Sequence, residues 1–263
     1  MKKVRQEVMN YSSISPLESH ILNTITKNNI ILFGVEEIKR LTKWNSNRVH
    51  NLLQSLEKKN YILRIKRNNY VITENINENI FRIATEVIEP SYISFWTALS
   101  YYGYTEQQIR TIQLVTTKQN KSFSILGFKI NPTTFLIKRF FDYKKTDNFV
   151  IATPEKTFID SLYQLDKCGG LEEYCKCLKN AWDKLNKKEL VDGLILFDNK
   201  SMISRIGYII DILSLKKTKH LEKLKTNISK SPIKLDPNNK KSGPYNKKWN
   251  ILVNHNIKTE EIK

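Results

Sequence analysis

The sequence is poor in three residue types that mark particular protein classes. It has 3 cysteines, 8 glycines and 7 prolines among 263 residues. So few cysteines exclude a disulfide framework, and so little glycine and proline excludes collagen-like and low-complexity chains. Cys168, Cys175 and Cys177 are odd in number and match no zinc-ligand spacing. We therefore expect packed free thiols and no metal.

Long hydrophobic runs are also missing from the sequence. Ile206–Leu213 is one of the longest apolar segments, and it falls far short of the roughly 18 residues that a membrane helix needs. Gln6, Glu7 and Asn10 interrupt any signal-peptide core near the start. No clear basic amphipathic helix supports binding to a membrane surface. The sequence predicts a cytoplasmic protein with no membrane partner.

Acidic residues are scarce relative to basic ones. The chain has 26 Asp and Glu against 44 Lys and Arg, which gives a formal net charge of +18, and its pI is about 9.7. The first 73 residues alone hold 13 basic and 5 acidic residues. An excess of this sign favours a polyanionic partner.

Recognisable catalytic motifs are absent as well. The sequence has no P-loop, G-x-G-x-x-G, G-x-S-x-G or H-E-x-x-H. Asp142 and Glu155 flank an expected strand, which invites a metal-nuclease interpretation, but Glu155 and Asp160 are five residues apart and share no helix face. We expect Glu155 and Lys156 to cap and solvate a helix. The sequence predicts no enzyme and no cofactor.

The most informative stretch that is present begins with three short helical patterns. Ser15-Pro16-Leu17-Glu18 has the residues of a capping box with proline at the first helical position. Gly34 interrupts the chain, and residues 35–41 form a second helical pattern. Asn45 is a candidate cap for a third helix. The apolar stripe of that third helix consists of Val49, Leu52, Leu53 and Leu56.

Two β-rich runs follow the third helix, at residues 61–65 and 70–73, and Lys66-Arg67-Asn68-Asn69 joins them. Three helices followed by a hairpin predict a winged helix-turn-helix over residues 1–73. Its hairpin is the wing.

The polar residues left outside this pattern suit recognition of double-stranded DNA. A helix in the major groove reads bases with Arg on guanine and with Asn or Gln on adenine, and we expect Arg48, Asn51 and Gln54 to do so. Wing cations suit phosphate contacts, which set affinity and register. The alternative is a winged helix used for protein contact, with these residues as a solvated face. The candidate DNA-binding residues are Asn47, Arg48, His50, Asn51, Gln54, Lys58, Arg64, Lys66 and Arg67.

The remaining chain predicts a linking helix over residues 74–90 and a mixed α/β domain over residues 91–263, with a small sheet and several helices. The overall fold class is therefore α+β. A Lys-rich tail after Leu213 is expected to be irregular, and the strand-like run 249–254 is expected to return to the sheet, either to pair with it or to cover its edge. Expected helices are 92–103, 155–165 and 171–213, the last interrupted near Asp192-Gly193 and near Asp198-Asn199. Expected strands are 112–117, 123–130, 135–141 and 149–152.

Several blocks of this second part resemble the AbiEi family of type IV antitoxins. They are E-P-S-Y-I-S at Glu89–Ser94, P-E-K-T-F-I-D at Pro154–Asp160, R-I-G-Y at Arg205–Tyr208 and S-G-P-Y-N-K-K-W-N at Ser242–Asn250. The resemblance covers nearly the whole chain. It implies abortive-infection phage defence, with a winged helix that represses its own operon at inverted repeats. It also implies a second domain that counteracts a nucleotidyltransferase toxin without a stable complex.

Two hypotheses therefore follow from the sequence. The first is a DNA-binding antitoxin and autorepressor. The second is a protein-interaction module that neutralises a partner by direct binding, with the winged helix as a dock.

Overall fold

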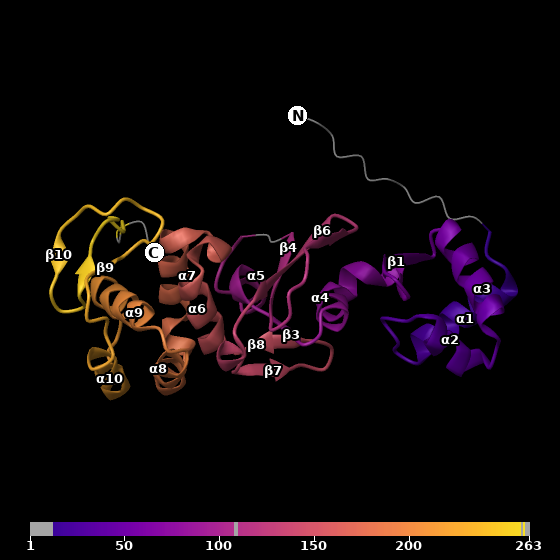
Figure 1. Ribbon diagram of the computed structural model, residues 1–263, viewed down its shortest axis with the longest axis horizontal. Helices are drawn as coiled ribbons and strands as arrows, with labels where there is room; N and C mark the ends of the chain where they lie inside the picture. The colour runs from indigo at the N-terminus through magenta and orange to yellow at the C-terminus, as the bar shows by residue number, and fades with distance from the viewer. Residues whose placement is uncertain (1–12, 108–109, 259, 261–263) are drawn as a thin grey trace, which may run out of the picture. The chain divides into compact units, whose positions relative to one another are not determined.

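The computed structural model describes residues 13–107, 110–258 and 260 (Figure 1). The chain divides into two compact units, Met1–Glu89 and Pro90–Lys263, and each has a hydrophobic core of its own. Both units combine helices with strands, so the fold class is α+β, as predicted. Among the described residues, no helix is long and apolar enough to cross a membrane.

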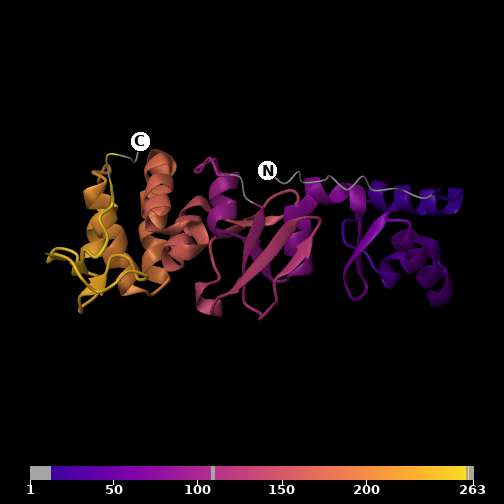
Figure 2. The ribbon, with the colours of Figure 1, turned by 90° about the horizontal axis from the view of Figure 1, so that it is seen from above.

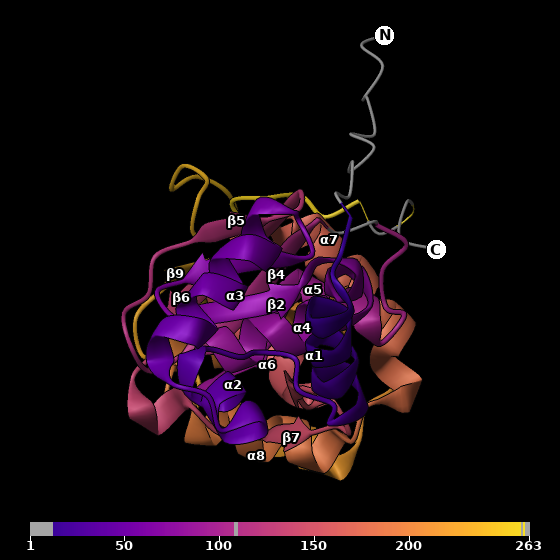
Figure 3. The ribbon, with the colours of Figure 1, turned by 90° about the vertical axis from the view of Figure 1, so that its right-hand side faces the viewer.

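The first unit holds three helices, a hairpin and a fourth helix. Figure 3 shows α1, α2 and α3 near strand β2, and the core beneath them contains Ile25, Ile38 and Leu53. The short helix η1 leads from the hairpin into α4. The elements are α1 (Pro16–Lys27), α2 (Val35–Thr42), α3 (Ser46–Lys58), β1 (Ile62–Lys66), β2 (Asn69–Ile72), η1 (Thr73–Asn75) and α4 (Ile76–Val87).

Local capping explains where α1 and α3 begin. The Ser15 hydroxyl accepts from the Glu18 amide at 3.3 Å, and the Glu18 carboxylate accepts from the Ser15 amide at 2.8 Å. The Asn45 side chain accepts from the Arg48 amide at 2.9 Å. Each cap satisfies an amide that the first helical turn leaves without a partner. The predicted capping box and the predicted Asn45 cap are both confirmed.

The second unit is built around a six-stranded mixed sheet of order β5-β6-β4-β3-β8-β7. β4 pairs parallel with β6 and antiparallel with β3, and β3 pairs parallel with β8. The strands are β3 (Ser91–Ile93), β4 (Thr111–Thr116), β5 (Phe123–Ile125), β6 (Phe128–Thr134), β7 (Tyr143–Lys145) and β8 (Val150–Ala152).

Helices form most of the chain after this sheet, and they share one core with it. Figure 2 shows the sheet, then the helices, then the C-terminal segment in yellow. Tyr92 and Val115 of the sheet and Phe158, Tyr174 and Ile206 of the helices all belong to that core. The helices are α5 (Phe95–Tyr101), η2 (Ile137–Arg139), α6 (Pro154–Tyr163), η3 (Leu165–Cys168), α7 (Gly170–Ala181), η4 (Trp182–Lys184), α8 (Lys187–Leu196), α9 (Lys200–Ile212), η5 (Lys219–Leu221) and α10 (Glu222–Lys225).

The C-terminal segment does not return to the main sheet, so that prediction was wrong. Its strand β11 (Ile251–Leu252) pairs with β9 (Ile233–Lys234) and β10 (Tyr245–Asn246) in a separate three-stranded sheet. Trp249 packs on α9 instead, where a Cβ on Gly207 would lie 2.2 Å from its ring. The lack of a side chain at Gly207 therefore leaves room for the Trp249 indole to pack against the core.

Four further predictions fail. The expected helix 92–103 begins only at α5, because the residues before it form the central strand β3. This strand is buried on both faces, and a short apolar run of this kind looks the same in a helix and in a buried strand. The expected strand 135–141 is the short helix η2 instead, and the expected strand 123–130 turns at Leu126-Gly127, where both φ angles are positive. Helix α8 runs through Gly193, which leaves room for the Ile159 side chain.

Candidate nucleic-acid interface

Helix α3 separates its residues into a buried stripe and an exposed face. Val49, Leu52, Leu53 and Leu56 are buried in the core of the first unit, as the spacing predicts. The candidate residues on the same helix are all exposed, namely Asn47, Arg48, His50, Asn51, Gln54 and Lys58. The helix therefore presents a continuous polar face, because residues three and four apart are neighbours on its surface.

Two contacts fix the beginning of this face. The Arg48 guanidinium lies over the Trp44 ring, 3.8 Å from its centroid, which is cation–π geometry. The His50 Nδ1 atom lies 2.8 Å from the Ser46 carbonyl oxygen. Arg48 is thus held against an aromatic ring while it stays exposed, so its position depends on Trp44.

The hairpin cations differ in how they are held. Arg64, Lys66 and Arg67 are all exposed. The Lys66 ammonium donates to the Val87 carbonyl at 3.2 Å, which is the C-terminal end of α4, and a cation is favourable at that end of a helix. Lys66 therefore has a structural role, and Arg67 stands at the turn between β1 and β2.

Asn68 anchors the hairpin turn to the start of α2, a role that the sequence reading missed. Its backbone has φ of 59°, and its Oδ1 accepts from the Val35 amide at 2.9 Å. A Cβ on Gly34 would lie 2.2 Å from the Asn68 carbonyl oxygen. Beside them, Phe33 and Tyr70 exchange two backbone hydrogen bonds of 3.0 and 2.8 Å. Gly34 is therefore needed for close backbone approach, and this approach sets the position of Arg67.

Glu18 ties α1 to the far end of α3, a second role that the sequence reading missed. Its carboxylate accepts from the Lys59 ammonium at 2.7 Å and from the Ser55 hydroxyl at 2.7 Å. Burial opposes the charged form, but these partners and the Ser15 amide outweigh burial and lower the pKa of Glu18 to about 2. A charged carboxylate, only 5% exposed, thus holds the helix that carries the polar face.

The second unit buries an ion pair on α6, contrary to the expectation that Lys156 is solvated. Lys156 and Asp160 are both fully buried and form a salt bridge. The Lys156 ammonium also donates to the Tyr92 hydroxyl at 3.0 Å, and Ser94 donates to Asp160 at 2.7 Å. Phe141 contributes the nearest of four rings around the ammonium, at 4.7 Å. Burial is the main influence on both pKa values, lowering that of Lys156 and raising that of Asp160.

Glu155 is buried too, and its Oε1 accepts from the Asn186 amide at 2.7 Å, which joins α6 to the start of α8. Both expectations of a solvated side chain fail because α6 lies inside the core, where six other residues of the helix are buried as well. Across the described chain, no group of three His, Cys, Asp or Glu side chains is placed to hold a metal ion. The three cysteines are free and buried, as predicted.

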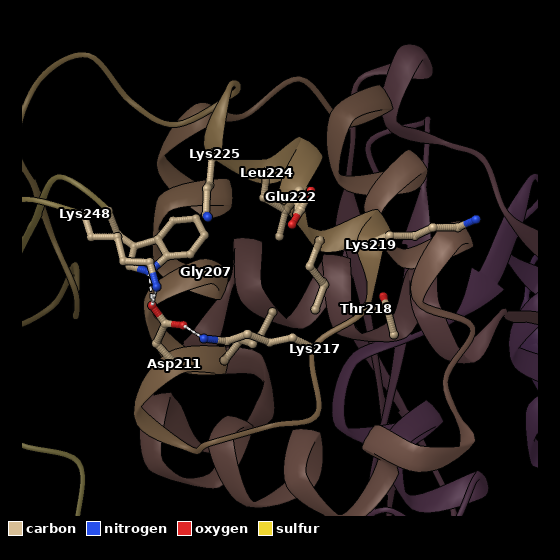
Figure 4. Close-up of a pocket in the computed structure, with 12 residues that line it drawn as sticks. Gly207, Asp211, Lys217, Thr218, Lys219, Glu222, Leu224, Lys225 and Lys248 are labelled. Atoms are coloured by element: carbon tan, nitrogen blue, oxygen red, sulfur yellow. Dashed lines mark hydrogen bonds and ion pairs between the residues drawn. The ribbon is translucent and has the colours of Figure 1, made fainter.

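A pocket of about 370 Å³ lies between α9, α10 and the segment before β11 (Figure 4). Asp211 stands on one side, where it forms an ion pair with Lys217 at 2.7 Å and accepts hydrogen bonds from Lys248 and the Trp249 indole at 2.5 and 2.6 Å. Burial opposes its charge, but these three donors prevail and lower the pKa of Asp211 to about 2. The cluster attaches the C-terminal segment to α9, which gives it a structural role.

Comparisons with known proteins inform the fold alone. No protein-family model matches the sequence, and no curated protein matches it. The structure is similar to the crystal structure of RV2827C protein from Mycobacterium tuberculosis, with a TM-score of 0.66 over 93% of this chain and 94% of that chain. The two sequences are 10% identical. The similarity therefore extends over both units, and it is one of architecture.

Proposed function

We propose that this protein is a DNA-binding antitoxin of the AbiEi kind, which represses its own operon at inverted repeats. In this proposal the first unit is a winged helix-turn-helix with α3 as the recognition helix and the β1–β2 hairpin as the wing. The second unit counteracts a nucleotidyltransferase toxin. The protein acts in the cytoplasm without catalysis of its own.

The observation that carries the DNA-binding part is the exposed face of α3. All six candidate residues of that helix are exposed, while its four apolar residues are buried. Arg48, Asn51 and Gln54 supply the guanidinium and amide groups that pair with guanine and adenine edges in the major groove. The hairpin adds Arg64 and Arg67, which suit phosphate contacts.

The antitoxin part rests on the sequence blocks of the second unit. Pro154–Asp160 forms most of α6, whose Lys156 and Asp160 are buried, and Tyr92 and Ser94 of the block Glu89–Ser94 contact this pair. The block Ser242–Asn250 contains Trp249, which packs on Gly207 of the block Arg205–Tyr208. The blocks that carry the resemblance thus meet in two packing clusters.

A gel-shift titration on the DNA upstream of the gene tests the repressor. At two salt concentrations, we expect tight, stepwise retardation of that DNA and only weak, salt-sensitive retardation of a scrambled duplex. Arg48→Ala is expected to reduce the binding free energy by roughly 1–3 kcal/mol on the upstream DNA and not on the scrambled duplex. Arg67→Ala is expected to weaken binding to both duplexes and to reduce the salt dependence. Equal losses on both duplexes for Arg48→Ala would refute base readout by Arg48.

An exposed apolar patch favours a second candidate function, direct binding of a partner protein. Leu136 and Ile137 are 63% and 82% exposed, and Leu196 is 57% exposed. Arg139 donates to the Phe197 carbonyl at 3.2 Å, which joins the two segments that carry these residues. Adjacent exposed aliphatic side chains are typical of protein-binding surfaces. Co-purification of the toxin with the wild-type chain and not with Ile137→Lys would support this function over the first.

A further inference from the structure

A second pocket of the C-terminal unit lies on one face of the six-stranded sheet. Its volume is about 390 Å³, which is within the range of about 300–1,000 Å³ for small-molecule sites. Strands β4 and β6 form its floor, and α5 and η3 contribute to its walls. Among its lining residues are Trp96, Gln113, Lys129, Asn131 and Lys167.

The strand register gathers polar side chains on this floor. Thr111 lies opposite Lys129, and Gln113 lies opposite Asn131. Alternate residues of a strand point to the same face, so the four side chains share one face of the sheet. On the opposite face of β4, Ile112 and Leu114 are apolar and fully or almost fully buried. Over residues 111–114 the polar side chains of β4 therefore lie on the pocket side.

Gln113 is an unusual member of this row because it is only 7% exposed. Its Nε2 donates to the Lys167 carbonyl at 2.9 Å. Its Oε1 has no hydrogen-bond partner among the described residues. Buried amide oxygens nearly always have a donor, so an unpaired one at a pocket indicates a place for a ligand or water donor.

Trp96 is held at the edge of this pocket. Its indole Nε1 donates to the Thr105 hydroxyl at 3.4 Å, and that hydroxyl donates to Glu173 at 2.8 Å. The ring also lies close to Gly169, whose Cβ would be 3.1 Å from it. A half-buried indole with a fixed orientation is a suitable surface for stacking an aromatic ring.

The charge of the pocket is positive. Arg110, Lys129 and Lys167 line it, and Asp166 is the one acidic residue among the lining residues that the structure describes. Cations beside an aromatic ring and amide groups form the combination that binds nucleotides, because the ring stacks on a base, the amides pair with the base edge and the cations bind phosphate.

We propose that this pocket binds one nucleotide unit, either free or within single-stranded RNA. The base stacks on Trp96, Gln113 and Asn131 contact the base edge, and Lys129 and Lys167 bind the phosphate. If the proposed function holds, the site explains how the second unit opposes a nucleotidyltransferase without a stable complex. Both proteins would bind the same nucleotide or RNA substrate.

Fluorescence anisotropy with the full-length protein tests the site. One probe is a labelled single-stranded RNA dodecamer, and the other is a fluorescent ATP analogue. We expect saturable binding of one of them, weakened about 5- to 100-fold by Trp96→Leu or Lys129→Ala. Lys145→Ala is the matched control, because Lys145 is exposed on β7 at the opposite edge of the sheet. Arg67→Ala controls for binding by the first unit.

The probe that saturates identifies the source of the nucleotide. Lys129 is exposed, so Lys129→Ala keeps the fold and carries the test if Trp96→Leu does not fold. Saturable binding by neither probe, or wild-type affinity of Lys129→Ala, would overturn the proposal. Gel shifts with operator DNA, run on the same protein preparations, test the proposed repressor function separately. A Lys129→Ala chain that represses but no longer rescues growth would tie the pocket to antitoxicity, and full rescue would break that link.

Discussion

Substitution of Glu18 by glutamine gives the sharpest test of how the first unit is held together. Glu18 accepts hydrogen bonds from Lys59, Ser55 and Ser15, and its pKa is lowered from 4.5 to about 2. A shift of one unit corresponds to about 1.4 kcal/mol, so the charged carboxylate contributes about 3 kcal/mol to the free energy of unfolding at neutral pH. Glu18→Gln keeps the size of the side chain and removes this contribution.

The pH dependence follows from the sign of the shift. Because the folded-state pKa lies below the unfolded value, the contribution is complete above pH 4.5 and is lost as pH falls toward 2. At about pH 3, between the two values, roughly 1.4 kcal/mol remains. The difference in stability between wild type and Glu18→Gln is therefore expected to shrink steadily on acidification.

Hydrogen exchange of the α1 and α3 amides, resolved by mass spectrometry, measures this difference in the full chain. Corrected for intrinsic rates, exchange at neutral pH is expected to be about 100-fold faster in Glu18→Gln than in wild type. Glu36→Gln is the control, because Glu36 is exposed on α2 and pairs with Lys39 of the same helix. Equal exchange in Glu18→Gln and wild type, or a difference that does not change with pH, would refute the reasoning.

Three further predictions concern close packing and the buried pair. Gly34→Ala is expected to weaken operator binding in gel shifts at least as much as Arg67→Ala does, because its Cβ would displace the Asn68 backbone at the hairpin turn. Gly207→Ala is expected to lower the melting temperature and to change the fluorescence of Trp249, because the ring occupies the place of the new Cβ. Lys156→Met is expected to cost about 3–5 kcal/mol in urea unfolding because it leaves the Asp160 carboxyl buried without its ammonium partner, and adding Asp160→Leu is expected to recover much of the loss.

The parts of the fold that could be predicted are those with local causes. The cap of α1 and its proline, the Asn45 cap and the apolar stripe of α3 all lie within a few residues of the helix they define. Helix α6 likewise begins where Thr153 caps it and Pro154 occupies the first position. Each of these signals acts over one or two helical turns, so the sequence contains it directly.

The parts that failed depend on contacts between distant residues. Ser91–Ile93 is a strand because β4 and β8 pair with it on both sides, and no local pattern distinguishes it from the start of α5. Lys156 looks like a surface residue until Tyr92 and Asp160 surround it. β11 pairs with β9 and β10 and not with the main sheet. The apolar residues of β11 alone do not determine which strands it pairs with.

The candidate interface also contains both kinds of residue, those that local sequence identifies and those that act through distant partners. The side chains proposed to read DNA are exposed and local, so composition and helical spacing were enough to name them. The residues that place those side chains are Glu18, Gly34 and Asn68, and each acts through a partner more than 30 positions away. Under the proposed function, substitutions of the first kind are expected to change which base is preferred, and substitutions of the second kind are expected to move α3 or the hairpin as a whole. Specificity and affinity are therefore expected to respond to different residues, and only the first set could be identified without the structure.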